Sequence, residues 1–367
     1  MKLATIIKYY LLWQLAIILI SLIGQKILPI RESYLGVGTL KYMENQLLYS
    51  RANFDGNHYL RIATGGYGYA EQAFFPLYPN LIKKFLPVVR NDALTGVLIS
   101  STAFFFACVA LVRLVELDYS SKIAKYTLLL LLVFPTSFYF GAVYTEGLFI
   151  FLVLMTFYLA RTRHWWLAGI FGALAANARF VGIFLFPALL LEWWPQRRTR
   201  NLLPILLIPL GLVVYMLFLH QTAGDALAFF HVQKLYGQFR SERVILLYQV
   251  FWRYFKMLAT VTRTDPQYFT IIIEFVTGLS FLYLSILSFV KKIRPSYILF
   301  NLAAFLVPTL TGSFVSLPRY VLACFPSFLL MGILMSDHPR LRSVIYISFS
   351  YLFFVILVLF SRGYWVG

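Results

Sequence analysis

Charged residues are scarce in this chain. Only 13% of its 367 residues are Asp, Glu, Lys or Arg, whereas 60% are apolar and the mean hydropathy is +0.77. This composition excludes an ordinary soluble domain, in which about a quarter of the residues are charged. Apolar runs of bilayer-crossing length recur along the chain. The sequence therefore predicts an all-α polytopic membrane protein.

Other common features are missing as well. The two cysteines, Cys108 and Cys324, both lie inside apolar runs, so neither a disulfide framework nor a cysteine metal site is expected. The chain contains no N-x-S/T sequon, no repeat of 20–50 residues and no low-complexity linker. We therefore expect residues 1–367 to form a single integral membrane domain.

Positive charge is in excess, with a formal net charge of +18. The basic residues are scattered between apolar runs and do not form one patch. This distribution disfavours a nucleic-acid partner and favours contact with membrane lipid at the two interfaces.

The apolar runs predict eleven membrane spans. The first lacks a small-x-small cleavage site and is longer than a signal-peptide core, so we expect a retained helix. Several runs are shorter than the ~20 residues that a perpendicular helix needs, which predicts kinked or partly embedded segments. The expected spans are about 9–28, 92–112, 123–140, 146–160, 165–177, 181–194, 202–219, 268–290, 297–311, 319–335 and 343–361.

The short connections favour a cytoplasmic N-terminus and an external C-terminus. Basic residues gather in the connections assigned to the inside, whereas the short outside turns carry only Arg179, with Arg319 just beyond the last turn. The inside set is Arg113, Lys122, Lys125, Arg161, Arg163, Arg197, Arg198, Arg200, Lys291, Lys292, Arg294, Arg340 and Arg342. This orientation makes the long segments 31–91 and 220–267 extracytoplasmic, with surface helices expected at 40–49 and 78–85.

The most informative stretch is Phe54–Pro79, FDGNHYLRIATGGYGYAEQAFFPLYP. Taken alone, Asp55 is typical of a helix cap or an Asp-Gly turn. The stretch resembles the first-loop signature of PIG-V-like mannosyltransferases, W-D-x-x-x-[YF]-L-x-I-A-x-x-G-Y followed by A-F-F-P-x-[YF]-P. Phe54 stands where Trp is usual. Members of that family are multi-span enzymes of the GT-C class, so the resemblance implies a GT-C-type fold with a long helical first external loop.

Shorter motifs similar to those of the family follow in the family's order. Y-T-E-G-L-F resembles S-E-S-L-F, and A-N-A-R-F-V-G resembles A-x-x-[TS]-R-x-x-G, with Ala178 where a hydroxyl residue is usual. G-D-A-L-A-F-F-H-V-Q resembles G-D-P-L-A-F-x-x-A-Q, and L-P-R-Y carries the family's P-R-Y. The polar residues in these motifs are Thr145, Glu146, Arg179, His231, Gln233, Arg319 and Tyr320.

Each of these residues also has a structural explanation. Glu146 fits the first turn of a helix, where the helix dipole favours an acid. Arg179 and Arg319 can extend to the membrane interface, and His231 can be a packing residue. Three further basic residues can attract anionic lipid, namely Lys234, Arg240 and Arg243. Ionisable residues that converge at the ends of several spans on one face nevertheless indicate a functional site.

The resemblance implies transfer of a sugar from a polyprenyl-phosphate donor. Asp55 aligns with the family's first-loop acid and is expected to be the base, and a single base implies one displacement with inversion. Arg179 and Arg319 suit the phosphate leaving group, because arginine binds phosphate in a bidentate way. The remaining residues expected to bind substrate are His58, Tyr59, Glu146, His231, Gln233 and Tyr320.

The expected sugar is mannose or a related hexose, and the expected acceptor is a lipid-linked or surface glycan outside the cytoplasm. The compact, sequon-free chain favours a bacterial or archaeal plasma membrane. No cofactor is expected, and a divalent-metal requirement stays open. The chain has no D-x-D pair, which many nucleotide-sugar enzymes use to hold a metal. Two alternatives remain: a lipid or solute transporter, whose site would lie near the bilayer midplane, and a non-catalytic subunit of a glycan-assembly complex.

Overall fold

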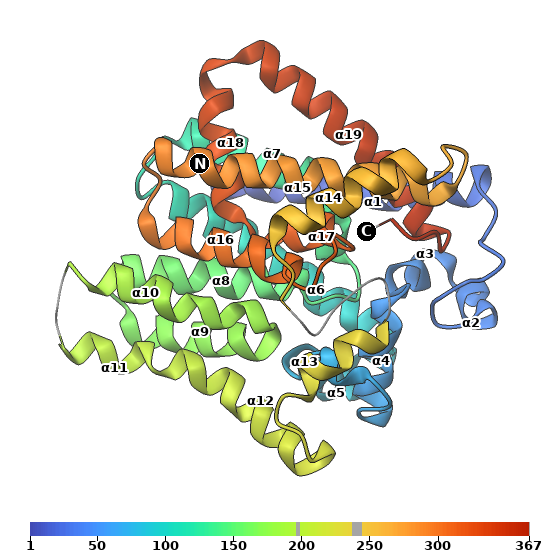
Figure 1. Ribbon diagram of the computed structural model, residues 1–367, viewed down its shortest axis with the longest axis horizontal. Helices are drawn as coiled ribbons and strands as arrows, with labels where there is room; N and C mark the ends of the chain where they lie inside the picture. Colours follow the sequence, from blue (N-terminus) through green and yellow to red (C-terminus); the bar gives the residue numbers. More distant parts are fainter. Residues whose placement is uncertain (196–198, 237–243, 367) are drawn as a thin grey trace.

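The computed structural model describes residues 1–195, 199–236 and 244–366, and the described residues form helices and turns without a β-strand (Figure 1). Four residues named above lie outside the described ones: Arg197, Arg198, Arg240 and Arg243.

Five helical segments in the described part of the chain are long and apolar enough to cross a bilayer. They are α1 (Leu3–Ile27), α6 (Asp92–Val115), the segment Thr199–Ala223 that joins η5 (Thr199–Asn201), α11 (Leu202–Ile205) and α12 (Leu207–Ala223), α15 (Pro266–Val290) and α19 (Pro339–Ser361). A sixth is α17 (Leu317–Tyr320) with η7 (Val321–Ala323) and α18 (Phe325–Asp337), if this pair, bent by 81°, is one span. The predicted count of eleven spans is therefore not confirmed.

The shortfall has two physical causes. The run expected at 123–140 ends as a helix at Val133, because Pro135 forces the preceding residue out of the helical conformation. Other apolar helices are too short: α9 (Trp165–Ala178) has 14 residues and rises about 21 Å, less than the roughly 30 Å of a bilayer core. The remaining short apolar elements are α7 (Ser121–Val133), η3 (Ser137–Gly141), α8 (Glu146–Arg161), η4 (Phe180–Phe184), α10 (Leu185–Trp193) and α16 (Pro295–Thr309).

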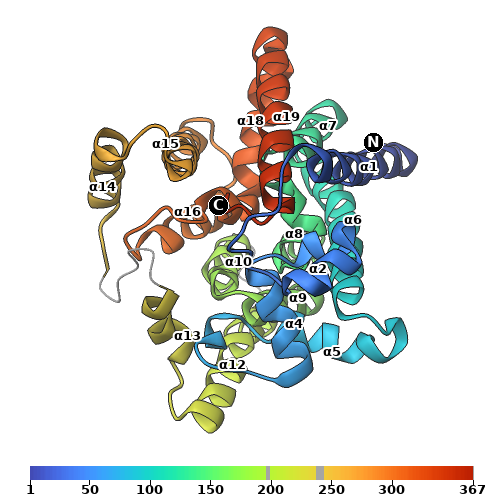
Figure 2. The ribbon, with the colours of Figure 1, turned by 90° about the vertical axis from the view of Figure 1, so that its right-hand side faces the viewer.

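The two long polar segments contain short helices, as the pattern of residues 31–91 predicts. The first segment folds into α2 (Thr39–Glu44), α3 (Gln46–Tyr49), η1 (Ser50–Ala52), α4 (Asp55–Gly65), η2 (Glu71–Ala73) and α5 (Leu77–Val89). The second contains α13 (Ala228–His231), η6 (Val232–Tyr236) and α14 (Leu247–Thr260). α14 packs alongside α15, as both ribbon views show (Figures 1 and 2).

Helices pack closely where glycine replaces a side chain. A Cβ at Gly147 of α8 would lie 2.6 Å from the carbonyl oxygen of Ser100 in α6, and one at Gly211 of α12 would lie 2.0 Å from the carbonyl oxygen of Ala173 in α9. Such contacts allow helix backbones to approach in a membrane bundle. Between α6 and η3, Phe104 and Phe140 stack with ring centroids 4.1 Å apart.

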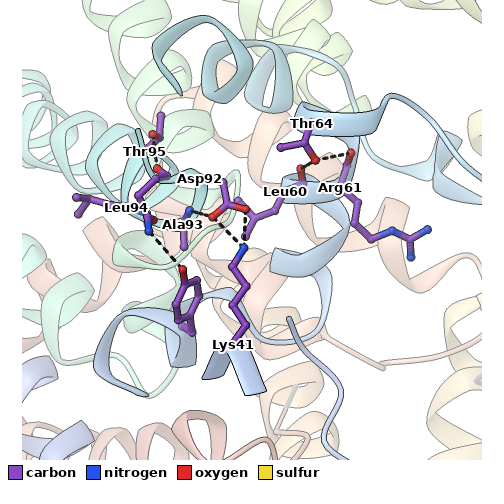
Figure 3. A network of polar contacts seen from close by, with 10 residues as sticks. Lys41, Leu60, Arg61, Thr64, Asp92, Ala93, Leu94 and Thr95 are labelled. Carbon is purple, nitrogen blue, oxygen red and sulfur yellow. Dashed lines mark hydrogen bonds and ion pairs between the residues drawn. The ribbon is translucent and has the colours of Figure 1, made fainter. Parts of the chain in front are cut away.

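The long helices give the molecule two distinct ends. The chain begins at one end, where the amino group of Met1 contacts Glu116 after α6. The C-terminus lies away from the N-terminus, on the side of the molecule where α2 and α3 are found, and α4 and α5 lie below it in the view of Figure 1. On this side Lys41 of α2 lies 2.9 Å from Asp92, the first residue of α6, which joins the first polar segment to a long helix (Figure 3).

Candidate active site

Asp55 is the first residue of α4. Phe54, which precedes it, has a φ of 53°, a conformation that costs a non-glycine residue energy and recurs at functional sites. This conformation is held in place, because the Phe54 N–H donates to the Leu35 carbonyl at 2.9 Å and the ring packs edge-on against Trp365. The Asp55 side chain is 25% exposed and accepts a hydrogen bond from Arg319.

Arg319 is a buried cation, with a side chain that is only 6% exposed. It lies in α17, which begins after Ser316 in a left-handed conformation and has Pro318 in its first turn. Its Nη1 donates to Asp55 Oδ2 at 2.6 Å, and its Nε lies 3.5 Å from Glu146 Oε1. The guanidinium also stands over three tyrosine rings, at 5.5, 5.2 and 5.1 Å from the centroids of Tyr139, Tyr144 and Tyr320.

Glu146 joins two arginines. It begins α8, is 4% exposed, and its Oε1 accepts from Arg179 Nη1 at 2.8 Å as well as contacting Arg319. Arg179 lies where α9 ends, in an extended conformation, and its guanidinium is over the rings of Phe149 and Tyr320. Acids and arginines therefore alternate in the order Asp55, Arg319, Glu146, Arg179. This alternation keeps buried charges paired, which lowers the cost of removing them from water.

A cavity of about 620 Å³ contains this charged row. Its size is within the range of ligand pockets in proteins. Eight of the nine predicted site residues line it, and they are Asp55, His58, Tyr59, Glu146, Arg179, Gln233, Arg319 and Tyr320. Another part of its wall is apolar and consists of Phe180, Val181, Phe229, Phe230, Val307 and Pro308.

His231 is the ninth predicted residue, and it is not among the described residues that line the cavity. Its side chain is 48% exposed and its Nδ1 lies 2.7 Å from Asp225 Oδ2. The hydrogen bond to His231 lowers the pKa of the Asp225 carboxyl group. Gln233 of η6 lines the cavity and donates to the Phe229 carbonyl at 3.3 Å, which connects this segment to the site.

Two tyrosines near the acids are held in their neutral form. Burial raises the pKa of Tyr59, and the nearby carboxylates of Glu146 and Asp55 raise it further. The pKa of Tyr144 is raised by burial and then by Tyr139 and Asp55. The Tyr144 hydroxyl donates to the Asn53 carbonyl at 2.8 Å, which supports the backbone just before Asp55.

Sequence reasoning missed two acids that support the site. Glu71 lies in the Phe54–Pro79 stretch and contacts His58 of the cavity at 3.0 Å. Glu274 is 3% exposed in α15, where it accepts from the Tyr254 hydroxyl at 2.5 Å and from the Ser316 N–H at 3.3 Å, and so holds the turn before Arg319. An acid inside an apolar run is itself a signal of function, and it could have indicated Glu274.

Within the described parts of the chain, no group of three or more His, Cys, Asp and Glu side chains is arranged to hold a metal ion. The side chains that line the cavity include carboxylates, arginines and aromatic rings. Carboxylates can accept protons, and arginines can hold an anionic group such as phosphate.

The described residues form a helical membrane protein with acids, arginines and an apolar wall in one cavity, and this arrangement suits a membrane enzyme. The chain matches the mannosyltransferase (PIG-V) family over residues 5–189, which is half of its length, and it belongs to that family. The members of that family are described as mannosyltransferases.

No curated protein matches the chain. Seven chains of solved structures match it. One is the crystal structure of the Archaeoglobus fulgidus oligosaccharyltransferase in complex with Zn and sulfate, with 14% sequence identity and a TM-score of 0.44. The match covers 96% of this chain and 53% of that one, so this chain spans about half the length of that structure.

Proposed function

We propose that the protein transfers mannose, or a related hexose, from a polyprenyl-phosphate donor to a lipid-linked or surface glycan acceptor. We further propose a GT-C-type fold, a single displacement with inversion, and an active site on the extracytoplasmic face of a bacterial or archaeal plasma membrane. The main support is one cavity in which Asp55, Arg319 and Arg179 converge beside an apolar wall.

In the proposed reaction Asp55 is the base. The acceptor hydroxyl oxygen attacks the anomeric carbon while the bond from that carbon to the phosphate oxygen breaks. The hydroxyl proton goes to the Asp55 carboxylate, and the bonding electrons leave with polyprenyl phosphate. Inversion follows, because the base acts on the acceptor and forms no covalent bond to the sugar.

Arg319 has two roles in this scheme. Without substrate it donates to Asp55 at 2.6 Å, which occupies part of the carboxylate. A donor phosphate in the cavity competes for the same guanidinium and leaves more of the carboxylate available to the acceptor hydroxyl. Arg179 lies on the other side of Glu146. The two guanidinium groups can therefore both donate hydrogen bonds to the leaving phosphate as its negative charge develops.

The apolar wall suits the isoprenoid tail of the donor. It combines η4, α13 and the end of α16, and Phe180, Phe229 and Pro308 contribute to it. Burial of an apolar chain against such side chains stabilises binding by about 25 cal/mol per Å². Gln233, Tyr320, Tyr59 and His58 then remain for the sugar and the acceptor, and His231 stays a prediction as a substrate-binding residue.

The donor class decides between this proposal and a nucleotide-sugar enzyme. A purified sample should transfer labelled mannose from polyprenyl-phosphate mannose to an added lipid-linked acceptor. It should not use GDP-mannose or UDP-glucose when lipid intermediates are absent. Direct transfer from either nucleotide sugar would overturn the proposal. Measurement with several polyprenyl-phosphate sugars will identify the hexose.

A further inference from the structure

Glu71 is a buried acid that the proposed reaction does not use. Its side chain is 1% exposed, and it lies in η2, between α4 and α5. Its Oε2 accepts from the Gly68 N–H at 2.8 Å, and its Oε1 lies 3.0 Å from His58 Nδ1 and 3.6 Å from Arg61 Nε. Burial of a carboxylate is costly unless partners compensate, so this arrangement needs an explanation.

The backbone around Glu71 is shaped to hold its carboxylate. Gly66 has a φ of 83°, and Ala70, directly before η2, has a φ of 62°. The left-handed conformation is unfavourable for alanine and persists only where the surroundings enforce it. A Cβ at Gly68 would lie 3.1 Å from Glu71 Oε2, so the turn closes tightly around the acid.

His58, the partner of Glu71, lies on the same face of α4 as Asp55. The two residues are three positions apart, which places their Cβ atoms about 5–6 Å from each other. The imidazole stacks on Phe74 with centroids 4.9 Å apart and an interplanar angle of 20°. Both His58 and Asp55 line the cavity. The ring is thus held by stacking on one side and by a carboxylate at Nδ1.

A carboxylate accepts hydrogen bonds and does not donate them, so Nδ1 carries the proton in the contact with Glu71. Nε2 is then the ring nitrogen that gains or loses a proton while this contact persists. A carboxylate that fixes a histidine tautomer in this way is a recurring device for proton transfer.

We propose that Glu71 is a positioning residue that orients His58 to receive the acceptor proton from Asp55. This inference rests on the proposed function. Asp55 first takes the proton as the bond to the phosphate breaks. The proton then passes to Nε2 of His58, directly or through one water, and Glu71 stabilises the resulting imidazolium. Release of the proton to solvent restores neutral His58 and ionised Asp55 for the next turnover.

Replacement of Glu71 by Gln tests the positioning role in the full-length protein. The amide keeps the size of the side chain but can donate to Nδ1 and so favour the other tautomer. We expect kcat to fall by about 10–100-fold, the typical cost of losing a partner that orients a functional histidine, with an unchanged KM for the donor. The pH profile of kcat should also differ between the wild type and E71Q.

Thr64→Val is the matched control on the same helix. The exposed Thr64 hydroxyl donates to the Leu60 carbonyl at 3.0 Å near the end of α4, outside the cavity (Figure 3). The variant removes a hydrogen bond from the helix without touching Glu71 or His58. We expect wild-type kcat and an unchanged pH profile.

His58→Ala with added imidazole keeps the inference testable if E71Q folds poorly. Neutral imidazole should restore activity, and the restoration should increase with pH. Restoration that increases as pH falls would mean that a cation holds the phosphate, and it would overturn the proton-transfer role. Wild-type kcat in a folded E71Q protein would overturn it too. A wild-type protein that transfers no sugar from a polyprenyl-phosphate donor would overturn the proposed function and this inference together.

Discussion

Replacement of Asp55 by Asn separates proton transfer from structure at the proposed active site. The amide has the size of the carboxylate, and its oxygen can still accept the hydrogen bond that Arg319 donates at 2.6 Å. The amide cannot take the proton of an acceptor hydroxyl, however. The substitution therefore removes the base and leaves the position of Arg319 largely unchanged.

The surroundings of Asp55 determine how far D55N lowers kcat and how far it lowers the stability of the fold. Loss of a general base lowers kcat by about 10²–10⁴-fold, which is about 3–5 kcal/mol of barrier. Breaking a fully buried ion pair costs about 3–5 kcal/mol of stability. Asp55 is 25% exposed, and Arg319 keeps its contact with Glu146 at 3.5 Å, so solvent and Glu146 reduce this cost. A hydrogen bond to a charged group is worth about 1.5–3 kcal/mol, and the amide oxygen of D55N keeps part of this energy by accepting from Arg319. We therefore expect D55N to lose about 1–2 kcal/mol of stability.

The assay is single-turnover transfer from labelled polyprenyl-phosphate mannose by protein in lipid nanodiscs, with thermal unfolding measured on the same samples. Asp92→Asn is the matched control, because it removes the carboxylate of another ion pair, with Lys41 at 2.9 Å, outside the cavity (Figure 3). D92N should keep wild-type transfer, whereas D55N should bind the donor and transfer almost nothing. Turnover of D55N near the wild-type rate would refute the reasoning, and Glu146 would then be the remaining carboxylate in the row to test as the base.

Three further predictions concern the leaving group, stability and topology. Arg319→Lys and Arg179→Lys keep the charge but lose the planar guanidinium group, so the KM for the sugar donor should rise while acceptor binding changes little. Unaltered donor kinetics in both variants would show that these residues only anchor the helices. Burial raises the pKa of Asp118, but its hydrogen bond from Arg161 and the charges nearby leave it lowered, so this group stabilises the fold above its unfolded pKa and loses that effect as pH falls through the folded pKa. D118N should therefore cost about 1 kcal/mol at neutral pH, and the difference in thermal stability from the wild type should shrink in acid; a constant difference would contradict this. A reporter fused after Gly367 should be external and one inserted at Arg198 cytoplasmic, and two reporters on the same side would disprove the predicted orientation.

The class of protein could be predicted from composition, because the energetics of burying side chains in a bilayer act residue by residue. Low charge and long apolar runs indicated a helical membrane protein, and the sequence around Asp55 indicated the family without any knowledge of the structure. The helices of the first polar segment were also predictable, since amphipathic spacing is a local property. The span count was not, because hydropathy cannot distinguish a full span from a short helix such as α9 or from the bend at Cys324 between η7 and α18.

What the sequence determined by itself was the set of residue types available for chemistry and the membrane setting in which they act. Only the tertiary structure decided which of them meet. Asp55 and Arg319 are separated by 264 residues, yet the bend before α18 and the start of α4 bring their side chains within 2.6 Å. The structure also joined Glu146 to both arginines, left His231 beside Asp225, and revealed Glu71 behind His58. These pairings depend on helix packing and on turns at Ser316 and Ala70, and such long-range geometry is set by the whole fold at once.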